Sequence, residues 1–247
     1  MQMPDDKGRL SILKSASQKM EKLTFPSLQR PDGNSKSPAT PELIDWGIRV
    51  FSFSLISHFR EMLRSFLFLA ENGHVLASFI ICRTMYEMAG QAYYVNKHID
   101  QYLKTDDLEK AWTLFIDVQT GSRYMQEFGG EPAYEIPPHI KRVMNCFNEY
   151  FGDKTATKSY SFLSEHTHPS TFTSVRHYEL SLDTKSIVFG EPPRNSSEAP
   201  LNNAITSTMT VMHFVNSLLL RTGENEVAHQ LREWLEEFVQ LHKGDKP

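Results

Sequence analysis

Apolar residues recur in alternating steps of four and three along two long neighbouring stretches of the chain, with a few polar residues in the same register. The first stripe runs through Ile44, Ile48, Phe51, Leu55, His58, Met62, Ser65 and Leu69, and the second through Leu76, Ile80, Arg83, Glu87, Gly90 and Tyr94. This spacing places side chains on one face of an α-helix. We therefore predict two amphipathic helices, over residues 41–71 and 74–104.

Local signals mark the ends of this pair of helices. Thr40 offers a capping hydroxyl, Pro41 suits the first helical turn, and Glu42 lies at the positive end of the helix dipole. Asn72-Gly73 is expected to turn the chain. The two helices should then pack as an antiparallel hairpin.

Helical spacing also appears on both sides of this hairpin. Further helices are expected near residues 10–23, from about 105 to before 129, over 139–151, 156–166 and 200–221, and along 227–241. Residues 171–180 and 185–189 break the helical rhythm and can pair as a small hairpin. The predicted fold is an all-α, mostly antiparallel helical bundle with a small β-hairpin or irregular insertion near residues 170–190.

A stretch rich in Pro, Ser, Gly and Asn, residues 24–39, separates the first predicted helix from the rest. We expect residues 1–39 to form an N-terminal helical arm and linker, residues 40–243 a helical bundle domain, and residues 244–247 a tail. The arm would pack on the bundle, exchange with a second subunit, or stay mobile.

Composition narrows the function classes. A net charge of -4 and a pI of about 6.2 give no overall basic field, so general binding to the nucleic-acid backbone is not expected. Cys82 and Cys146 show no metal-ligand spacing and are interpreted as reduced core thiols. The first residues lack the order of a secretory signal, and the apolar stretch 51–70 carries several charges. A cytoplasmic location without a membrane span is therefore expected.

The candidate chemistry begins with His58, Arg83 and Glu87, which interrupt the two apolar stripes. Counting outward from the predicted turn places His58 opposite Glu87 and one turn from Arg83. Burying charge is costly unless it is paired, so these residues are either a satisfied structural network or a site. In a site, Arg83 would bind an anion or phosphate while Glu87 acts as a base or orients His58.

A second group of candidates surrounds the sequence His166-Thr167-His168-Pro169. Pro169 disfavours helical geometry at the residue before it, so His168 is expected on a bend. His168 is either a functional residue or a cap at the negative end of a helix dipole. A metal site built from His58, Glu87, His166 and His168 has suitable ligand types, although no spacing requires it.

Several familiar chemistries lack their motifs. The chain has no P-loop, no G-x-G-x-x-G, no H-E-x-x-H, no G-x-S-x-G and no paired Glu-x-x-His motifs, and no cofactor is expected. Four tyrosines at helical spacing can stack on bases or another ring, or can form the edge of the core. They are Tyr86, Tyr93, Tyr94 and Tyr102.

Five short motifs occur between residues 45 and 220: Arg83-Thr84-Met85-Tyr86-Glu87, Tyr93-Tyr94, Tyr160-x-x-Leu163-Ser164, His168-Pro169 and Ile187-Val188-Phe189-Gly190. With these motifs, the chain resembles a mostly bacterial family of helical proteins of unknown function. The resemblance implies a helical fold with Arg, Glu and His near its centre, and it implies no activity. The chain is more loosely similar to helical RNA-cleaving domains of prokaryotic defence and toxin systems, in which a histidine follows an arginine by four to six residues.

The chain departs from that signature, because Met88, Ala89 and Gly90 follow Arg83 without a histidine. The first hypothesis is a helical module that acts by protein association in a bacterial stress or defence context, as a homo-oligomer. Exposed apolar seams on the two terminal helices would suit a homodimer. The alternative is a metal-independent RNA endonuclease in which Arg83 stabilises the transition state and His168 or His58 moves the proton. A further alternative is a sensor of small anions or metal ions.

Overall fold

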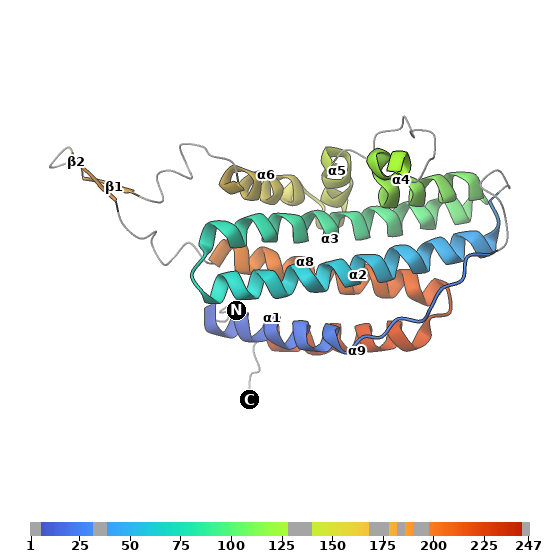
Figure 1. Ribbon diagram of the computed structural model, residues 1–247, viewed down its shortest axis with the longest axis horizontal. Helices are drawn as coiled ribbons and strands as arrows, with labels where there is room; N and C mark the ends of the chain where they lie inside the picture. Colours follow the sequence, from blue (N-terminus) through green and yellow to red (C-terminus); the bar gives the residue numbers. More distant parts are fainter. Residues whose placement is uncertain are drawn as a thin grey trace.

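The computed structural model describes residues 6–31, 39–127, 140–167, 178–181, 186–189 and 198–243. The helices are α1 (Asp6–Glu21), α2 (Pro41–Glu71), α3 (Val75–Lys104), α4 (Leu108–Glu127), α5 (Ile140–Phe151), α6 (Thr155–Thr167), α8 (Glu198–Arg221) and α9 (Asn225–Lys243). They pack side by side as a helical bundle (Figure 1). The predicted all-α bundle is confirmed.

The predicted hairpin of α2 and α3 is present, and its ends follow the expected signals. The Thr40 hydroxyl accepts a hydrogen bond from the Leu43 backbone N–H at 3.3 Å, and Pro41 is the first residue of α2. Gly73 has a φ of +73°, a conformation that glycine adopts without steric cost, and α3 begins two residues later. Both helices lie along the long axis of the bundle (Figure 1).

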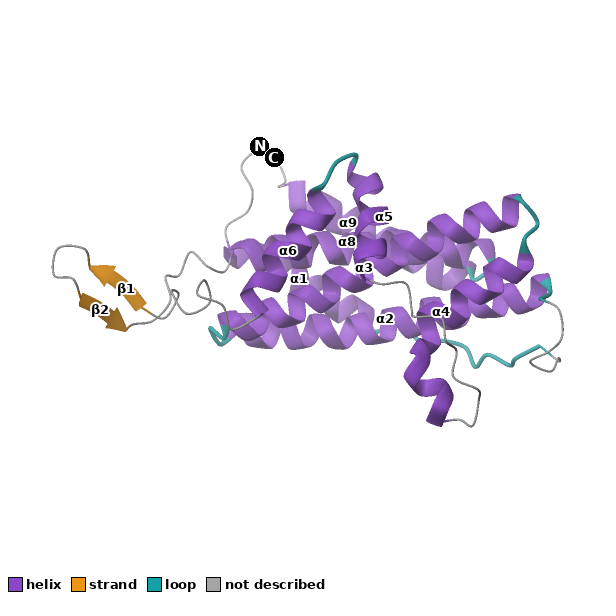
Figure 2. Ribbon diagram, turned by 90° about the horizontal axis from the view of Figure 1, so that it is seen from above, coloured by secondary structure: helices purple, strands orange, loops and turns teal. Residues whose placement is uncertain are grey.

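Helix α3 is the centre of the bundle, because it packs against α2, α4, α5, α6 and α8. It runs parallel to α8: the Cys82 thiol donates to the Pro200 carbonyl at 3.2 Å near the start of both helices. Near their ends, Arg221 pairs with Asp100 at 2.7 Å. Helices α4, α5 and α6 cover the side of α3 away from α1 and α9 (Figures 1 and 2).

The two terminal helices bury their apolar faces inside the chain. Helix α1 packs on α2, α8 and α9, with Leu13 and Met20 fully buried. Leu231 and Phe238 of α9 are buried as well. The arm thus packs on the bundle, which was one of its three predicted arrangements. Most of the apolar residues of these two helices are therefore covered within one chain, although Leu241 of α9 is 44 % exposed.

The segment after α1 also follows the bundle surface. The Phe25 ring stacks on Phe53 with centroids 4.8 Å apart, and the Arg30 guanidinium lies 5.8 Å from the Trp46 ring centroid. These contacts hold the first part of the predicted linker against α2.

A pair of short strands occurs where the sequence predicts a hairpin or irregular insertion. Strands β1 (Tyr178–Ser181) and β2 (Ser186–Phe189) pair antiparallel, with Tyr178 opposite Phe189 and Ser181 opposite Ser186.

None of the helices in the described ranges is both long and apolar enough to span a membrane.

The predicted apolar stripe of α2 is wrong in its second half. His58 is exposed, whereas the next residue, Phe59, is fully buried. On α3, Ile80 is 50 % exposed while Phe79 is fully buried. An α-helix has 3.6 residues per turn, so a fixed alternation of four and three drifts from the buried face. Phe59 and Phe79 have more apolar area than His58 and Ile80, so burying the two phenylalanines is more favourable.

Candidate functional site

Arg83 and Glu87 form a pair on α3, as predicted, but the pair is directed toward α6. An Arg83 nitrogen lies 3.1 Å from the Glu87 carboxylate and also donates to the Tyr160 hydroxyl at 2.6 Å. The guanidinium carbon lies 5.2 Å from the centroid of the Tyr160 ring. Arg83 therefore fastens α6 to α3 with the same group that a phosphate would need.

The histidines predicted to join Arg83 and Glu87 do not form a cluster with them among the described residues. The exposed position of His58 on α2 removes the reason for placing it against Glu87, and the predicted buried network of all three residues is wrong. His168 lies outside the described residues, as does the side chain of His166 at the end of α6. In the described ranges, no group of three or more His, Cys, Asp or Glu side chains has a metal-binding arrangement.

The exposure of the Arg83–Glu87 pair predicts a small energetic role for Glu87. The two side chains are 31 % and 27 % exposed, so water screens the pair. We expect Glu87→Gln to lower the free energy of unfolding by about 0–1 kcal/mol, because the pair is partly exposed and Arg83 still donates to the Tyr160 hydroxyl. Urea unfolding followed by circular dichroism measures the change. A loss of about 3–5 kcal/mol would instead identify a sealed ion pair.

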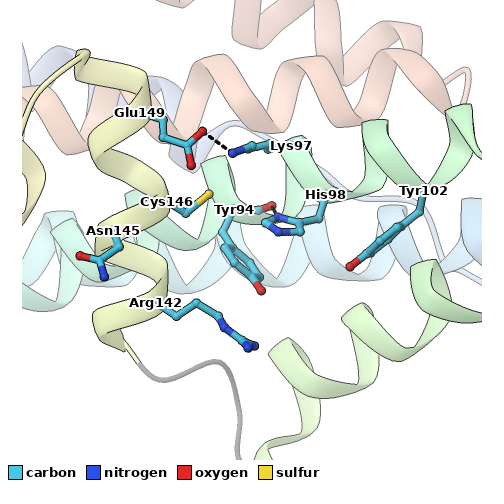
Figure 3. A pocket seen from close by; sticks show the side chains of 8 residues that line it. All are labelled: Tyr94, Lys97, His98, Tyr102, Arg142, Asn145, Cys146 and Glu149. Atoms are coloured by element: carbon cyan, nitrogen blue, oxygen red, sulfur yellow. Dashed lines mark hydrogen bonds and ion pairs between the residues drawn. The ribbon is translucent and has the colours of Figure 1, made fainter.

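A groove between α3 and α5 gathers more polar groups than the Arg83 cluster. Its volume is about 440 Å³. Helix α3 supplies one wall and α5 the other (Figure 3). The lining residues are Tyr94, Lys97, His98 and Tyr102 from α3, and Arg142, Asn145, Cys146 and Glu149 from α5.

Close packing at Gly90 fixes α5 on α3 beside this groove. A Cβ atom at residue 90 would lie 2.5 Å from the Met144 methyl carbon and 3.0 Å from Val143, so the missing side chain admits α5. One turn further along α5, the Phe147 ring packs between Tyr86 and Tyr93, at centroid distances of 5.6 and 5.8 Å. The apolar face of α5 is anchored there, and its polar face borders the groove.

The α3 wall is a ladder of aromatic rings spaced four residues apart. Tyr94 and His98 have ring centroids 4.2 Å apart, and His98 and Tyr102 are 6.1 Å apart. The His98 Nδ1 atom lies 2.9 Å from the Tyr94 carbonyl oxygen. Because a carbonyl only accepts, Nδ1 donates in this bond, and Nε2 is left for another partner.

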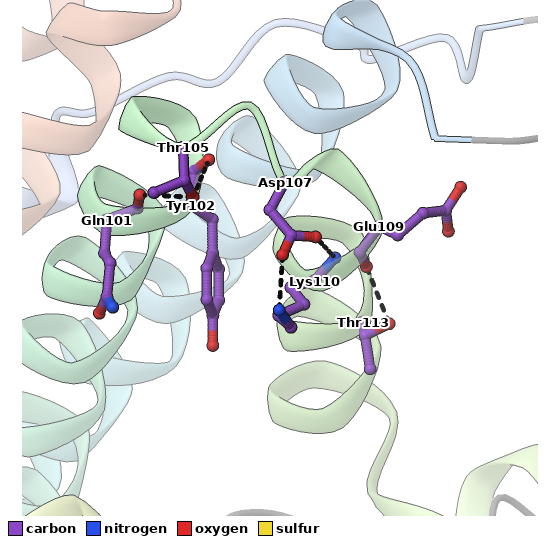
Figure 4. A network of polar contacts seen from close by, with 7 residues as sticks. All are labelled: Gln101, Tyr102, Thr105, Asp107, Glu109, Lys110 and Thr113. Atoms are coloured by element: carbon purple, nitrogen blue, oxygen red, sulfur yellow. Dashed lines mark hydrogen bonds and ion pairs between the residues drawn. The ribbon is translucent and has the colours of Figure 1, made fainter.

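The far end of the ladder is held by the corner between α3 and α4. The Thr105 hydroxyl donates to the Gln101 and Tyr102 carbonyls, each at 3.2 Å (Figure 4). Asp107 then caps α4 by accepting from the Lys110 backbone N–H at 3.2 Å. The Lys110 ammonium bonds the same carboxylate and lowers the pKa of Asp107. These bonds fix the last turn of α3, which carries Tyr102.

The groove carries two cations and one carboxylate. Lys97 from α3 pairs with Glu149 from α5, and this contact raises the pKa of Lys97. Arg142 is exposed, and no carboxylate of the described residues pairs with it. Figure 3 shows Arg142 reaching from α5 toward the hydroxyl end of Tyr94. Among the described residues, the groove therefore holds one positive charge, on Arg142, that no carboxylate pairs with.

The two weak acids in the groove do not offset this charge. Burial raises the pKa of the Tyr94 phenol, and the neighbouring Arg142 guanidinium opposes part of that rise. Burial also raises the pKa of the Cys146 thiol, while Lys97 acts in the opposite direction. Both groups are therefore neutral near pH 7, and Cys146 is a poor nucleophile.

Comparison with known proteins finds no match to a family model, a curated protein or a solved structure. The resemblance to a helical family therefore stays a prediction, and the site has to be interpreted from its own geometry. Sequence reasoning considered Tyr94 and Tyr102 as stacking residues but missed Lys97, His98 and Arg142. The spacing of Tyr94, His98 and Tyr102 by four residues is the signal that would have found the ladder.

Proposed function

We propose that the protein binds a small anionic molecule in the groove between α3 and α5. The observation that carries this proposal is the exposed Arg142 guanidinium, which borders the groove without a carboxylate partner among the described residues. A guanidinium presents a planar fork of donors that matches a carboxylate or a phosphate. The proposal develops the small-anion alternative from the sequence and moves its site from Arg83 to Arg142.

The size of the groove favours a small molecule. Its volume of about 440 Å³ falls within the range of ligand pockets, roughly 300–1,000 Å³. Arg83 is less suited to the role, because one of its nitrogens already contacts Glu87 and Tyr160. An incoming anion at Arg83 would compete with the Glu87 carboxylate, whereas the side-chain hydrogen bond of Arg142 is to the neutral Tyr94 phenol, and no carboxylate of the described residues pairs with it.

The other hypotheses stay predictions. The RNA-cleaving alternative required a histidine beside Arg83. His58 is exposed on α2, and His168 lies outside the described residues. The protein-association hypothesis, with its homodimer, has less support from the terminal helices than expected, because α1 and α9 bury most of their apolar residues within the chain. The cytoplasmic location also stays a prediction.

An NMR titration with inorganic phosphate tests the proposal. Backbone amide signals of the ¹⁵N-labelled protein are recorded as potassium chloride is replaced by potassium phosphate at constant ionic strength and pH. The expected result is a saturable shift that is concentrated in residues 97–102 and 142–149. Shifts that spread evenly over the surface, or that fail to saturate, would contradict a specific site.

The Lys97–Glu149 pair is expected to weaken the binding of an anion in the groove. Glu149 occupies Lys97 and places a negative charge on the groove wall, and the two side chains are 34 % and 58 % exposed. We expect Glu149→Gln to tighten phosphate binding roughly 2- to 5-fold, since an exposed pair of this kind is worth up to about 1 kcal/mol. The same titration gives the dissociation constants.

A matched control for this variant is Glu236→Gln. Glu236 forms an exposed pair with Arg232 on α9, so the control also removes one carboxylate and one surface ion pair. An equal gain in both variants would show that net charge, and not the groove, governs binding. A loss of affinity in Glu149→Gln would show that Glu149 supports the site.

A further inference from the structure

The aromatic ladder of Tyr94, His98 and Tyr102 indicates which anions the groove would prefer. We infer that it selects anions in which a phosphate or carboxylate is attached to a planar aromatic ring, and this inference rests on the proposed anion site. Arg142 would bind the anionic group, and the rings of His98 and Tyr102 would stack on the ligand's ring. Small anions without a ring would use Arg142 alone.

The first argument is the exposure of the rings along α3. Tyr94 is only 6 % exposed, and its neighbour His98 lies close to it, with centroids 4.2 Å apart. His98 and Tyr102 are each partly exposed and line the groove. Their centroids are 6.1 Å apart and their planes are inclined at 56°, so they do not stack face to face on each other. Ring surface therefore remains available to a ligand.

The second argument is the position of the cation relative to the rings. Arg142 reaches toward the hydroxyl of Tyr94 (Figure 3), and its guanidinium opposes part of the rise in the pKa of that phenol. The uncompensated charge and the exposed rings thus belong to one groove of about 440 Å³. Asn145 on the α5 wall adds a donor and an acceptor that can meet a polar atom of the ring.

The ordinary explanation for aromatic residues at helical spacing is the edge of the core. It accounts for Tyr93, which packs on Phe147 and Phe214, and for the buried Tyr94. Tyr102 also packs partly against the core, but core packing alone does not explain why Tyr102 and His98 line a hollow that also holds charged side chains. A ligand with both a ring and a negative charge matches both features.

Matched pairs of probes test the inference on the full chain. Dissociation constants are measured by NMR titration for phenyl phosphate against inorganic phosphate, and for benzoate against acetate. Each ring-bearing probe is expected to bind roughly 3- to 10-fold more tightly than its partner, which is the usual gain from one aromatic stacking contact. Tyr102→Leu and, as a second variant, His98→Leu should each bring this ratio toward 1.

Tyr150→Leu is the control, since Tyr150 is 47 % exposed on α5 and does not line the groove. It should leave the ratio at the wild-type value. If the two probes of each pair bind with equal affinity, and binding still requires Arg142, the ring preference would be overturned while the anion site would be supported. A ratio that survives in both ladder variants would also overturn the inference. Absence of binding by all four probes would overturn the anion site as well.

Discussion

Phe147→Ala is expected to lower the free energy of unfolding by about 3–5 kcal/mol, the usual cost of deleting a buried aromatic ring. Phe147 is fully buried, and its ring contacts the rings of Tyr86, Tyr93 and Tyr150. The cavity would lie where α5 is anchored on α3, so the surroundings cannot close without moving α5. Urea unfolding followed by circular dichroism at two protein concentrations measures the change.

A matched control is Phe68→Ala, because Phe68 is 63 % exposed on α2. Its effect should stay within about 0.5 kcal/mol, as is usual for surface substitutions. A loss below about 1 kcal/mol for Phe147→Ala would contradict the packing of α5 on α3, and with it the wall of the groove.

Arg142→Gln is expected to weaken the binding of phenyl phosphate by roughly 10- to 100-fold. A hydrogen bond to a charged group contributes about 1.5–3 kcal/mol, and 1.4 kcal/mol corresponds to a tenfold change in affinity. Arg142 is exposed, so the folded structure should tolerate the change. Dissociation constants from NMR titration at constant ionic strength give the effect. Arg142→Lys keeps the charge but loses the planar fork of donors. Its affinity for phenyl phosphate should therefore fall between those of the wild type and Arg142→Gln.

Arg64→Gln controls for the loss of one positive charge. Arg64 is also exposed, but it lies on α2 and does not line the groove. Its effect on affinity should be less than about 2-fold, because water and salt screen distant surface charges. Similar losses in Arg142→Gln and Arg64→Gln would contradict a direct role for Arg142.

The sequence predicts the helices well because their ends carry local signals. Thr40 and Pro41 begin α2 and Gly73 separates it from α3, as expected. Gly223, with a φ of +75°, separates α8 from α9. Such signals act through the bonds of the chain to its own near neighbours, so they can be identified without knowing the tertiary structure.

The orientation of each helix depends on packing, and there the sequence was a weaker guide. His58 and Phe59 are adjacent, and a small rotation of α2 decides which of them faces inward. The apolar stripe favoured His58 by its count of four and three, whereas burial of the larger apolar side chain favours Phe59. The predicted cluster of His58, Arg83 and Glu87 failed for this reason.

The groove could not be located from the sequence because its two walls are far apart along the chain. Tyr94 and Arg142 come from α3 and α5, and α4 lies between these helices in sequence. Their proximity follows from the close approach at Gly90, where Val143 and Met144 take the space of the missing side chain. The sequence places Gly90 on the apolar stripe of its helix, but it does not indicate which other helix packs against it.

A structure of the protein solved with phenyl phosphate tests the central claim most directly. The account predicts that the phosphoryl oxygens lie within hydrogen-bonding distance of the Arg142 guanidinium, with the phenyl ring against His98 and Tyr102 in the groove between α3 and α5. Phenyl phosphate bound elsewhere, or a groove that remains empty at concentrations that saturate the NMR titration, would contradict it.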